Sequence, residues 1–206
     1  MPDLSGTPLF HAFQRITLRF VQNASKWSYD DLSFVRLSSP APAEFDCGSA
    51  AQNDFLLRHA LTAHEEQVSA TYLGYLAGQC FGYVTLAPDS LETLPRERPR
   101  RVKRWPRIPA LKILQMATDL RFQGRGLGSA LVQFAVFVGC EADRVPYRYL
   151  TLDAVPERVG WYQRRGFTVS ELRQRERIAR LTDAGGDPGH LPVSMHMDLR
   201  DARSAR

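Results

Sequence analysis

The feature that most constrains the fold is one continuous segment in the middle of the chain. An apolar run over residues 110–118 predicts a buried strand, and a glycine-rich hexapeptide, Gln-Gly-Arg-Gly-Leu-Gly, occupies 123–128. A long apolar run starting at the glycines predicts a helix over about 126–139 that is buried on most sides. A strand, a glycine-rich turn and a helix in this order favour the binding of an anion, because the backbone N–H groups of the turn and the helix N-terminus point at one position.

The spacing of the glycines narrows the type of loop. No Gly-Lys-Ser/Thr follows, so this is not a Walker A loop, and glycines at 124, 126 and 128 do not fit G-x-G-x-x-G. The pattern is Q/R-x-x-G-x-G/A, with Gln123 first and Gly126 and Gly128 as the paired glycines. A glycine-rich turn that binds no ligand is the alternative.

The remaining segments alternate between strand and helix patterns, which predicts an α/β fold with a mixed sheet flanked by helices. Pro156 marks the start of one helix and Gly166 its C-cap. We expect a strand at 34–37, a helix ending near 66, a hairpin of 69–77 with 79–86, a strand at 147–154, and strands at 167–169 and 192–199.

Composition sets limits but names no function. The 206 residues are enough for one domain with decorations, and the net charge of +5 hints at a polyanionic partner. Three widely spaced cysteines suggest buried thiols, with neither a disulfide framework nor metal-ligand spacing, so we expect no metal. We expect no membrane association and a cytoplasmic protein, because the sequence shows no bilayer-spanning run and no secretory leader.

A basic, proline-rich segment over 88–109 is expected to be a loop, since its five prolines exclude a helix. It is either a solvated loop or a groove that follows a phosphate backbone, with Trp105 placed to stack on a base. Its candidate substrate residues are Arg96, Arg98, Arg100, Arg101, Lys103, Arg104, Trp105 and Arg107.

A second motif, at 161–167, reads aromatic-Tyr-x-x-x-Gly-Phe. Together with the 123–128 loop and the order of elements, it resembles the GNAT superfamily of N-acetyltransferases over about 34–199. The resemblance implies a GNAT fold for a domain at 33–200, with an N-terminal extension at 1–32 and a polar tail at 201–206. It also implies acetyl-CoA as the cosubstrate.

A narrower resemblance lies at the start of this domain. Residues 45–48 and 53–56, the strand at 82–86 and the Ile108-Pro109 pair look like the acetyltransferase toxins of bacterial toxin–antitoxin pairs. That group acetylates the α-amine of aminoacyl-tRNA and so blocks translation, and its neutralising partner is usually a ribbon–helix–helix antitoxin. We also expect a homodimer.

The resemblance assigns roles to residues. Residues 116–118 would present backbone groups along the pantetheine arm, and 123–130 would hold the pyrophosphate. Tyr162 would be the general acid, although a phenol with a pKa near 10 needs help to protonate a thiolate whose conjugate acid has a pKa near 8.5. A packed tyrosine bonded to a backbone carbonyl is the alternative. The cofactor-binding set is Met116, Ala117, Thr118, Gln123, Gly124, Arg125, Gly126, Leu127, Gly128, Ser129 and Ala130.

The sequence shows no distinctive general base; the nearest candidates are Asp153, Glu157, His59 and His64. An α-amine, with a pKa near 7.7–8.0 against about 10.4 for lysine, is partly neutral without one, which favours an α-amino substrate. Arg164 and Arg165 join the candidates for tRNA contact, whereas Arg173, Arg175 and Arg177 fit a solvated face better.

Two alternatives remain open from the sequence. One is a non-toxin acetyltransferase acting on a small-molecule amine or a protein amine. The other is a GNAT domain that binds acyl-CoA or a partner without turnover, which the intact glycines and Tyr162 disfavour.

Overall fold

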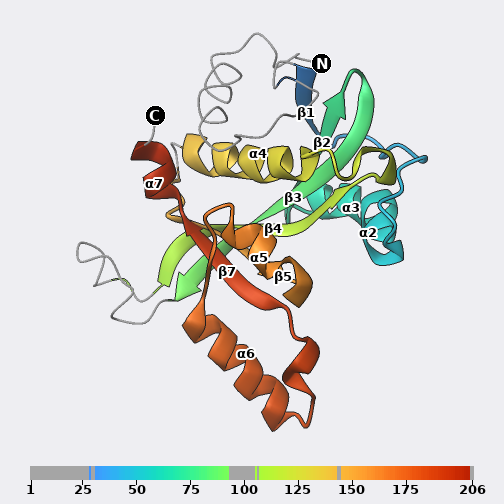
Figure 1. The fold of residues 1–206 in the computed structure, drawn as a ribbon. Coiled ribbons are helices and arrows are strands. Elements are labelled where there is room, and N and C mark those ends of the chain that lie inside the picture. Colours follow the sequence, from blue (N-terminus) through green and yellow to red (C-terminus); the bar gives the residue numbers. More distant parts are fainter. Residues whose placement is uncertain (1–27, 29–30, 93–104, 106, 143–144, 205–206) are drawn as a thin grey trace.

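A seven-stranded mixed sheet with the order β1-β2-β3-β4-β5-β7-β6 runs through the computed structural model (Figure 1). The structure describes residue 28, residues 31–92, residue 105, and residues 107–142 and 145–204. All neighbouring strands are antiparallel except β4 and β5. The strands are β1 (Leu32–Arg36), β2 (Ala70–Leu76), β3 (Gln79–Glu92), β4 (Arg107–Thr118), β5 (Tyr149–Ala154), β6 (Thr168–Val169) and β7 (Val193–Asp198). The α/β class predicted from the alternating patterns is therefore confirmed.

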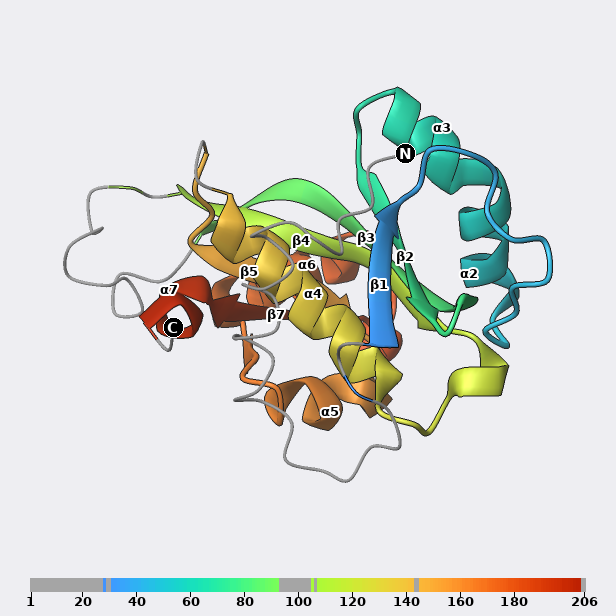
Figure 2. The same ribbon diagram turned by 90° about the horizontal axis from the view of Figure 1, so that it is seen from above.

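Helices cover both faces of this sheet, as the view from above shows (Figure 2). On β3, Val84 joins the core under α4, while its neighbour Tyr83 joins the cluster under the α2–α3 segment, because successive side chains of a strand point to opposite faces. The helical elements are α2 (Ala50–Asp54), η3 (Phe55–His59), α3 (Ala60–Glu65), η5 (Leu120–Phe122), α4 (Leu127–Glu141), η6 (Pro156–Arg158), α5 (Val159–Gln163), α6 (Glu171–Asp183), η7 (Pro188–His190) and α7 (Leu199–Ser204).

The two central strands diverge halfway along their length. β4 pairs with β5 only from Ala110 opposite Tyr149 to Ile113 opposite Leu152. The register of β4 against β3 shifts at the same point, leaving Leu114 without a partner residue, and a bulge of this kind bends its strand. Beyond Ile113, β4 therefore runs beside an opening instead of beside β5.

The prediction of a loop over the whole of 88–109 is wrong at both ends. β3 continues to Glu92 and β4 starts at Arg107, so that Pro88 lies opposite Leu111 within a strand pair. β2 pairs with β3 only as far as Leu86, and in the described chain β3 is an edge beyond that point. Edge strands tolerate proline, because its missing N–H is not needed on the open side.

The two ends of the domain also contribute to its core. Leu32 is buried in β1, although the sequence placed it in the 1–32 extension; the rest of that extension lies outside the described residues, apart from Ser28 and Asp31. The expected polar tail at 201–206 is helical as far as Ser204, with Leu199 and Ala202 of α7 buried. Arg203 fixes α7 by donating to three carbonyl oxygens at the end of α4 and in the segment before β5. No helix of the described chain is long and apolar enough to cross a membrane.

Candidate active site

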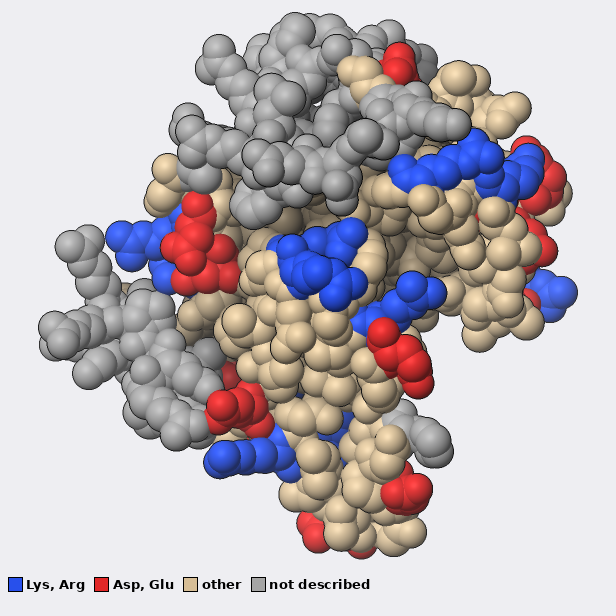
Figure 3. Space-filling model, viewed as in Figure 1, with Lys and Arg blue, Asp and Glu red and all other residues tan. Residues whose placement is uncertain are grey.

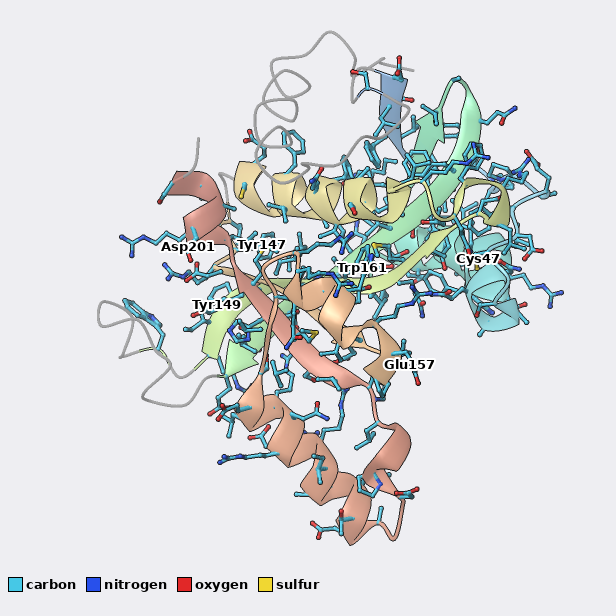
Figure 4. The ribbon with its side chains drawn as sticks, in the orientation of Figure 1. Cys47, Tyr147, Tyr149, Glu157, Trp161 and Asp201 are labelled. Atoms are coloured by element: carbon cyan, nitrogen blue, oxygen red, sulfur yellow. The ribbon has the colours of Figure 1, made fainter. Side chains whose placement is uncertain are left out.

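A cavity of about 850 Å³ lies where β4 and β5 diverge. Residues 113–118 of β4 form one wall, and residues 152–154 of β5 with Val155 after it form the other. The loop and helix start at 122–129 close one end. Trp161, Tyr162 and Arg165 border it from α5 and the turn after it; Figure 4 shows Trp161 below α4 and Cys47 near α2. The cavity thus joins the two sequence motifs, which are more than thirty residues apart, across the opening of the sheet.

The turn that leaves β4 is held rigidly by side chains. Buried Asp119 accepts hydrogen bonds from the backbone N–H of Arg121 and from its guanidinium, at 2.8–2.9 Å, and from the backbone of Asp46 at 3.2 Å. The Gln123 amide donates to the carbonyl oxygens of Cys47 and Thr118, both at 3.0 Å. The side chain of Gln123 therefore shapes the loop, while the backbone of the loop stays exposed.

The backbone of the loop fits a phosphate group. Gly124 and Gly126 have φ angles of +73° and +84°, which residues with a Cβ rarely adopt. Gly126 is the N-cap of α4, and the helix has neither a side-chain cap nor an acidic residue in its first turn. A Cβ on Gly128 would contact Trp161 at 3.5 Å and the Thr118 hydroxyl at 3.6 Å, so a side chain would narrow the cavity here. Because no side chain caps the start of α4, backbone N–H groups there are available to an anion.

Most of the predicted cofactor residues meet in this cavity. Met116, Ala117 and Thr118 lie on its β4 wall, and the loop residues 123, 124 and 126–129 line its end. Arg125 and Ala130 are not among the lining residues: Ala130 is fully buried in the core, and the Arg125 guanidinium lies 5.6 Å from the Phe122 ring centroid.

Tyr162 is half-buried at the cavity and is oriented by aromatic neighbours. Its ring packs edge-on against Trp161 at 4.8 Å and Phe167 at 5.6 Å between centroids. Burial raises the pKa of the phenol, while Arg158 and Arg165 oppose that shift, so the hydroxyl is protonated at neutral pH. Within the described chain the hydroxyl has no hydrogen-bond partner, which disfavours the alternative of a phenol bonded to a backbone carbonyl.

None of the four candidate bases has the features of one. Only Asp153 lines the cavity, and its carboxylate accepts hydrogen bonds from Lys112 at 2.7 Å and Ser194 at 2.8 Å and lies 2.9 Å from the Arg177 guanidinium. Although burial raises its pKa, these partners hold it well below the ordinary value. His59 pairs with Asp54, His64 lies 3.5 Å from the Arg36 guanidinium, and Glu157 is exposed outside the cavity.

The predicted acceptor-binding residues do not form one group. Residues 96, 98, 100, 101, 103 and 104 lie outside the described chain. Trp105 and Arg107 are exposed at the end of the β3–β4 hairpin and do not line the cavity. Arg164 is exposed, and blue side chains gather over α5 on the face shown in Figure 3, but Arg165 turns into the cavity.

The arginines of α6 are not a simple solvated face. Arg173 makes a bidentate ion pair with Asp89 at 2.9 and 3.0 Å, and Arg177 pairs with Asp153 at 2.9 Å. Only Arg175 behaves as expected, with 70% of its side chain exposed. Neither pair could be predicted from the sequence, because the acidic partners are 84 and 24 residues away.

The sequence analysis assigned no role at the site to several other lining residues, among them Gln52, Cys47 and Arg158. Gln52 donates to the carbonyl oxygen of Met116 at 3.1 Å and so ties α2 to the β4 wall. Cys47 also lines the cavity, and burial raises the pKa of its thiol. Arg158 lines the cavity from η6. No group of three or more potential metal ligands occurs among the described residues.

Comparison with known families agrees with this geometry. A model of the acetyltransferase (GNAT) domain matches residues 67–169, half of the chain. The chain belongs to the GNAT acetyltransferases. A tRNA-acetylating toxin of Mycobacterium tuberculosis is 32% identical over 94 residues, 45% of this GNAT chain. The match spans only about half of that relative, 55% of its length.

Solved toxin structures share the fold. AtaT in complex with acetyl-methionyl-tRNAfMet is 26% identical, with a TM-score of 0.59 over 67% of this chain and 87% of AtaT. A tyrosine-to-phenylalanine mutant of AtaT, bound to acetyl-CoA and the C-terminus of the antitoxin AtaR, is 22% identical, with a TM-score of 0.62 over 85% and 98%. A tyrosine-to-phenylalanine mutant of KacT is 21% identical, with a TM-score of 0.65 over 85% and 99%.

Proposed function

We propose that this GNAT protein is an acetyl-CoA-dependent N-acetyltransferase that acetylates the α-amine of aminoacyl-tRNA and thereby blocks translation. The observation that carries the acetyltransferase assignment is the joining of the anion-binding loop and Tyr162 across one cavity at the split of β4 and β5. The tRNA assignment draws on the toxin relative and on the AtaT complex with acetylated tRNA. Because charged tRNA is used in the cytoplasm, we place the reaction there.

The residues divide the work between binding and proton transfer. Acetyl-CoA, when bound, supplies an activated acetyl group on a thioester. The loop at 123–129 and the N-terminus of α4 would hold its pyrophosphate, and the β4 wall, freed from β5 beyond Ile113, would offer backbone groups to the pantetheine arm. Tyr162 holds a proton at its hydroxyl and would give it to the departing sulfur as the amine takes the acetyl group.

The absence of a base from the described cavity wall favours an amine that is already partly neutral. Asp153 is the only carboxylate among the lining residues, and three donors occupy it. A lysine side chain, with a pKa near 10.4, is almost wholly protonated at neutral pH, whereas an α-amine is not. Arg158 at the cavity also suits an acceptor carried by a polyanion.

The decisive experiment compares acceptors at equal concentration. The purified protein is incubated with labelled acetyl-CoA and aminoacyl-tRNA, deacylated tRNA, free amino acids or a lysine peptide. We expect label on the aminoacyl-tRNA, released by mild base that cleaves the ester, and none on deacylated tRNA. Equal or faster labelling of a small amine or the lysine peptide would replace the tRNA assignment with the non-toxin alternative.

Two partners belong to the same proposal. The AtaT structure with bound AtaR supports a small antitoxin as the neutralising partner, of the ribbon–helix–helix type expected from the sequence. We also propose a homodimer, testable by light scattering. Co-expression with an antitoxin encoded beside the gene should relieve growth arrest that the enzyme alone causes.

A further inference from the structure

Arg165 is a partly buried cation that is held by hydrogen bonds but has no acidic partner in the described chain. Its guanidinium donates to the Ser129 hydroxyl at 2.6 and 3.0 Å and to the Trp161 carbonyl at 2.7 Å, and it stacks 3.4 Å from the Trp161 ring centroid. These partners are neutral, and Arg165 forms no ion pair with a carboxylate of the described chain. A partly buried arginine is normally paired with an acidic group.

The charges around Arg165 make this placement unfavourable unless an anion compensates them. Ser129 lies in the first turn of α4, where the helix dipole is positive, so the guanidinium is held beside a second positive centre. Arg164 is its neighbour in sequence, and burial together with Arg164 lowers the pKa of Arg165. A cation fixed by three hydrogen bonds against like charge is preorganised for an anion that arrives from outside.

The cavity indicates which anion that is. Arg165 and Ser129 both line it, next to Gly126 and Gly128. Among the described residues that line it, only Asp153 is acidic, and it is paired with Lys112 and Arg177. We propose that Arg165 is a cofactor-positioning residue that, through its tether to Ser129, binds a phosphate of coenzyme A and completes the glycine-rich loop. This inference rests on the proposed function, and it moves Arg165 from the expected tRNA-binding set to the cofactor site.

The tether has a specific consequence. An arginine on a flexible side chain would lose conformational freedom on binding, whereas the contacts with Ser129 and Trp161 hold this one in place beforehand. The remaining N–H groups can then bind phosphate oxygens in a fork, a geometry that lysine lacks. Arg165→Lys should therefore recover only part of the affinity.

The test measures acetyl-CoA binding to the full-length protein by calorimetry, with Arg164→Gln as the matched control. Both Gln variants remove one positive charge, at adjacent positions, so a general charge effect would weaken both equally. We expect Arg165→Gln to weaken binding by about tenfold or more, Arg165→Lys to be intermediate, and Arg164→Gln to bind nearly as wild type does. Melting temperatures without ligand show whether each variant is folded.

Dephospho-CoA, which lacks the 3′-phosphate, identifies the group that is bound. If the loss in Arg165→Gln persists with dephospho-CoA, Arg165 binds the pyrophosphate; if it disappears, Arg165 binds the 3′-phosphate. Unchanged acetyl-CoA affinity in a folded Arg165→Gln variant, with a raised KM for tRNA alone, would overturn the inference and restore the tRNA role. Failure of the wild-type protein to bind acetyl-CoA would instead overturn the proposed function as well.

Should Arg165→Gln not fold, Ser129→Ala answers the same question. It removes the hydroxyl that tethers the guanidinium but keeps the charge. We expect Ser129→Ala to weaken acetyl-CoA binding a fewfold in the wild-type background. In the Arg165→Lys background, the same substitution should have no effect on the affinity. Equal losses in the two backgrounds would mean that Ser129 acts independently of Arg165, which contradicts the inference.

Discussion

Two polar regions meet at β5, where Asp153 borders both, and they differ in how their charges are satisfied. At the α6 side, Arg173 and Arg177 are paired with Asp89 and Asp153 at about 2.9 Å. At the cavity, Arg165 has only neutral partners, and the hydroxyl of Tyr162 has none in the described chain. The paired groups fix the structure, whereas the groups without matching partners are those that a ligand can satisfy.

The α6 region is a closed network. Gln174 accepts a hydrogen bond from the backbone of Ser194, and Thr151 donates to the Asp89 carboxylate at 2.6 Å. The network joins α6 to three strands, β3, β5 and β7. α6 has no buried residue of its own, so these polar contacts account for its attachment (Figure 1).

The largest effect should come from removing the Tyr162 hydroxyl. Tyr162→Phe removes the proton donor but no internal hydrogen bond, so kcat should fall by about 10²–10⁴-fold while the melting temperature stays near that of wild type. Steady-state acetylation assays measure kcat, and thermal unfolding measures the melting temperature. Tyr147→Phe, remote from the cavity, is the control (Figure 4). Unchanged turnover in Tyr162→Phe would remove the general-acid role.

At Asp153 we expect the main effect of a substitution to be on stability. Asp153→Ala leaves Lys112 and Arg177 without their shared carboxylate in a partly buried site, so the free energy of unfolding should fall by about 3 kcal/mol. Urea unfolding measures it. Asp183→Asn, which removes an equal charge at the exposed end of α6, should change stability by less than about 0.5 kcal/mol. Equal losses in both variants would mean that the network is not what stabilises this region.

Acid should weaken the α6 network. Burial alone would raise the pKa values of Asp89 and Asp153, but hydrogen bonds from Arg173, Arg177, Lys112 and nearby hydroxyls hold both below the ordinary value of 3.8. A carboxylate with a depressed folded-state pKa stabilises the fold fully above its unfolded pKa and loses that contribution as the pH falls further. Stability should therefore drop below about pH 4.

The Asp153→Asn variant isolates the share of that titration due to Asp153. Because its amide cannot titrate, the variant should lose stability less steeply between about pH 4 and pH 2 than wild type does, by up to about 1.4 kcal/mol per pH unit. Unfolding titrations at a series of pH values give both slopes. Parallel slopes would show that Asp153 titrates alike in the folded and unfolded chains.

The same contrast explains what the sequence could predict. The loop glycines were recognisable because a positive φ angle and close approach to a ligand are local requirements, written within six residues. The bulge at Leu114, which opens the cavity, could not be recognised in the sequence, because the apolar run continues through it without a break. Arg165 was assigned to tRNA because its sequence neighbours are basic, whereas its partner Ser129 is 36 residues away.

The smallest effect should come from the exposed pairs on α6. Arg175 lies 4.0 Å from Glu171, and their side chains are 70% and 48% exposed, so solvent screens the attraction and ordering the two chains costs entropy. Arg175→Gln should change the free energy of unfolding by less than about 0.5 kcal/mol. Arg173→Gln should cost much more, because it leaves the half-buried carboxylate of Asp89 without its partner. Chemical denaturation of both variants gives the difference directly. A comparable loss for the two would mean that charge on α6, and not pairing, determines how firmly the helix is held.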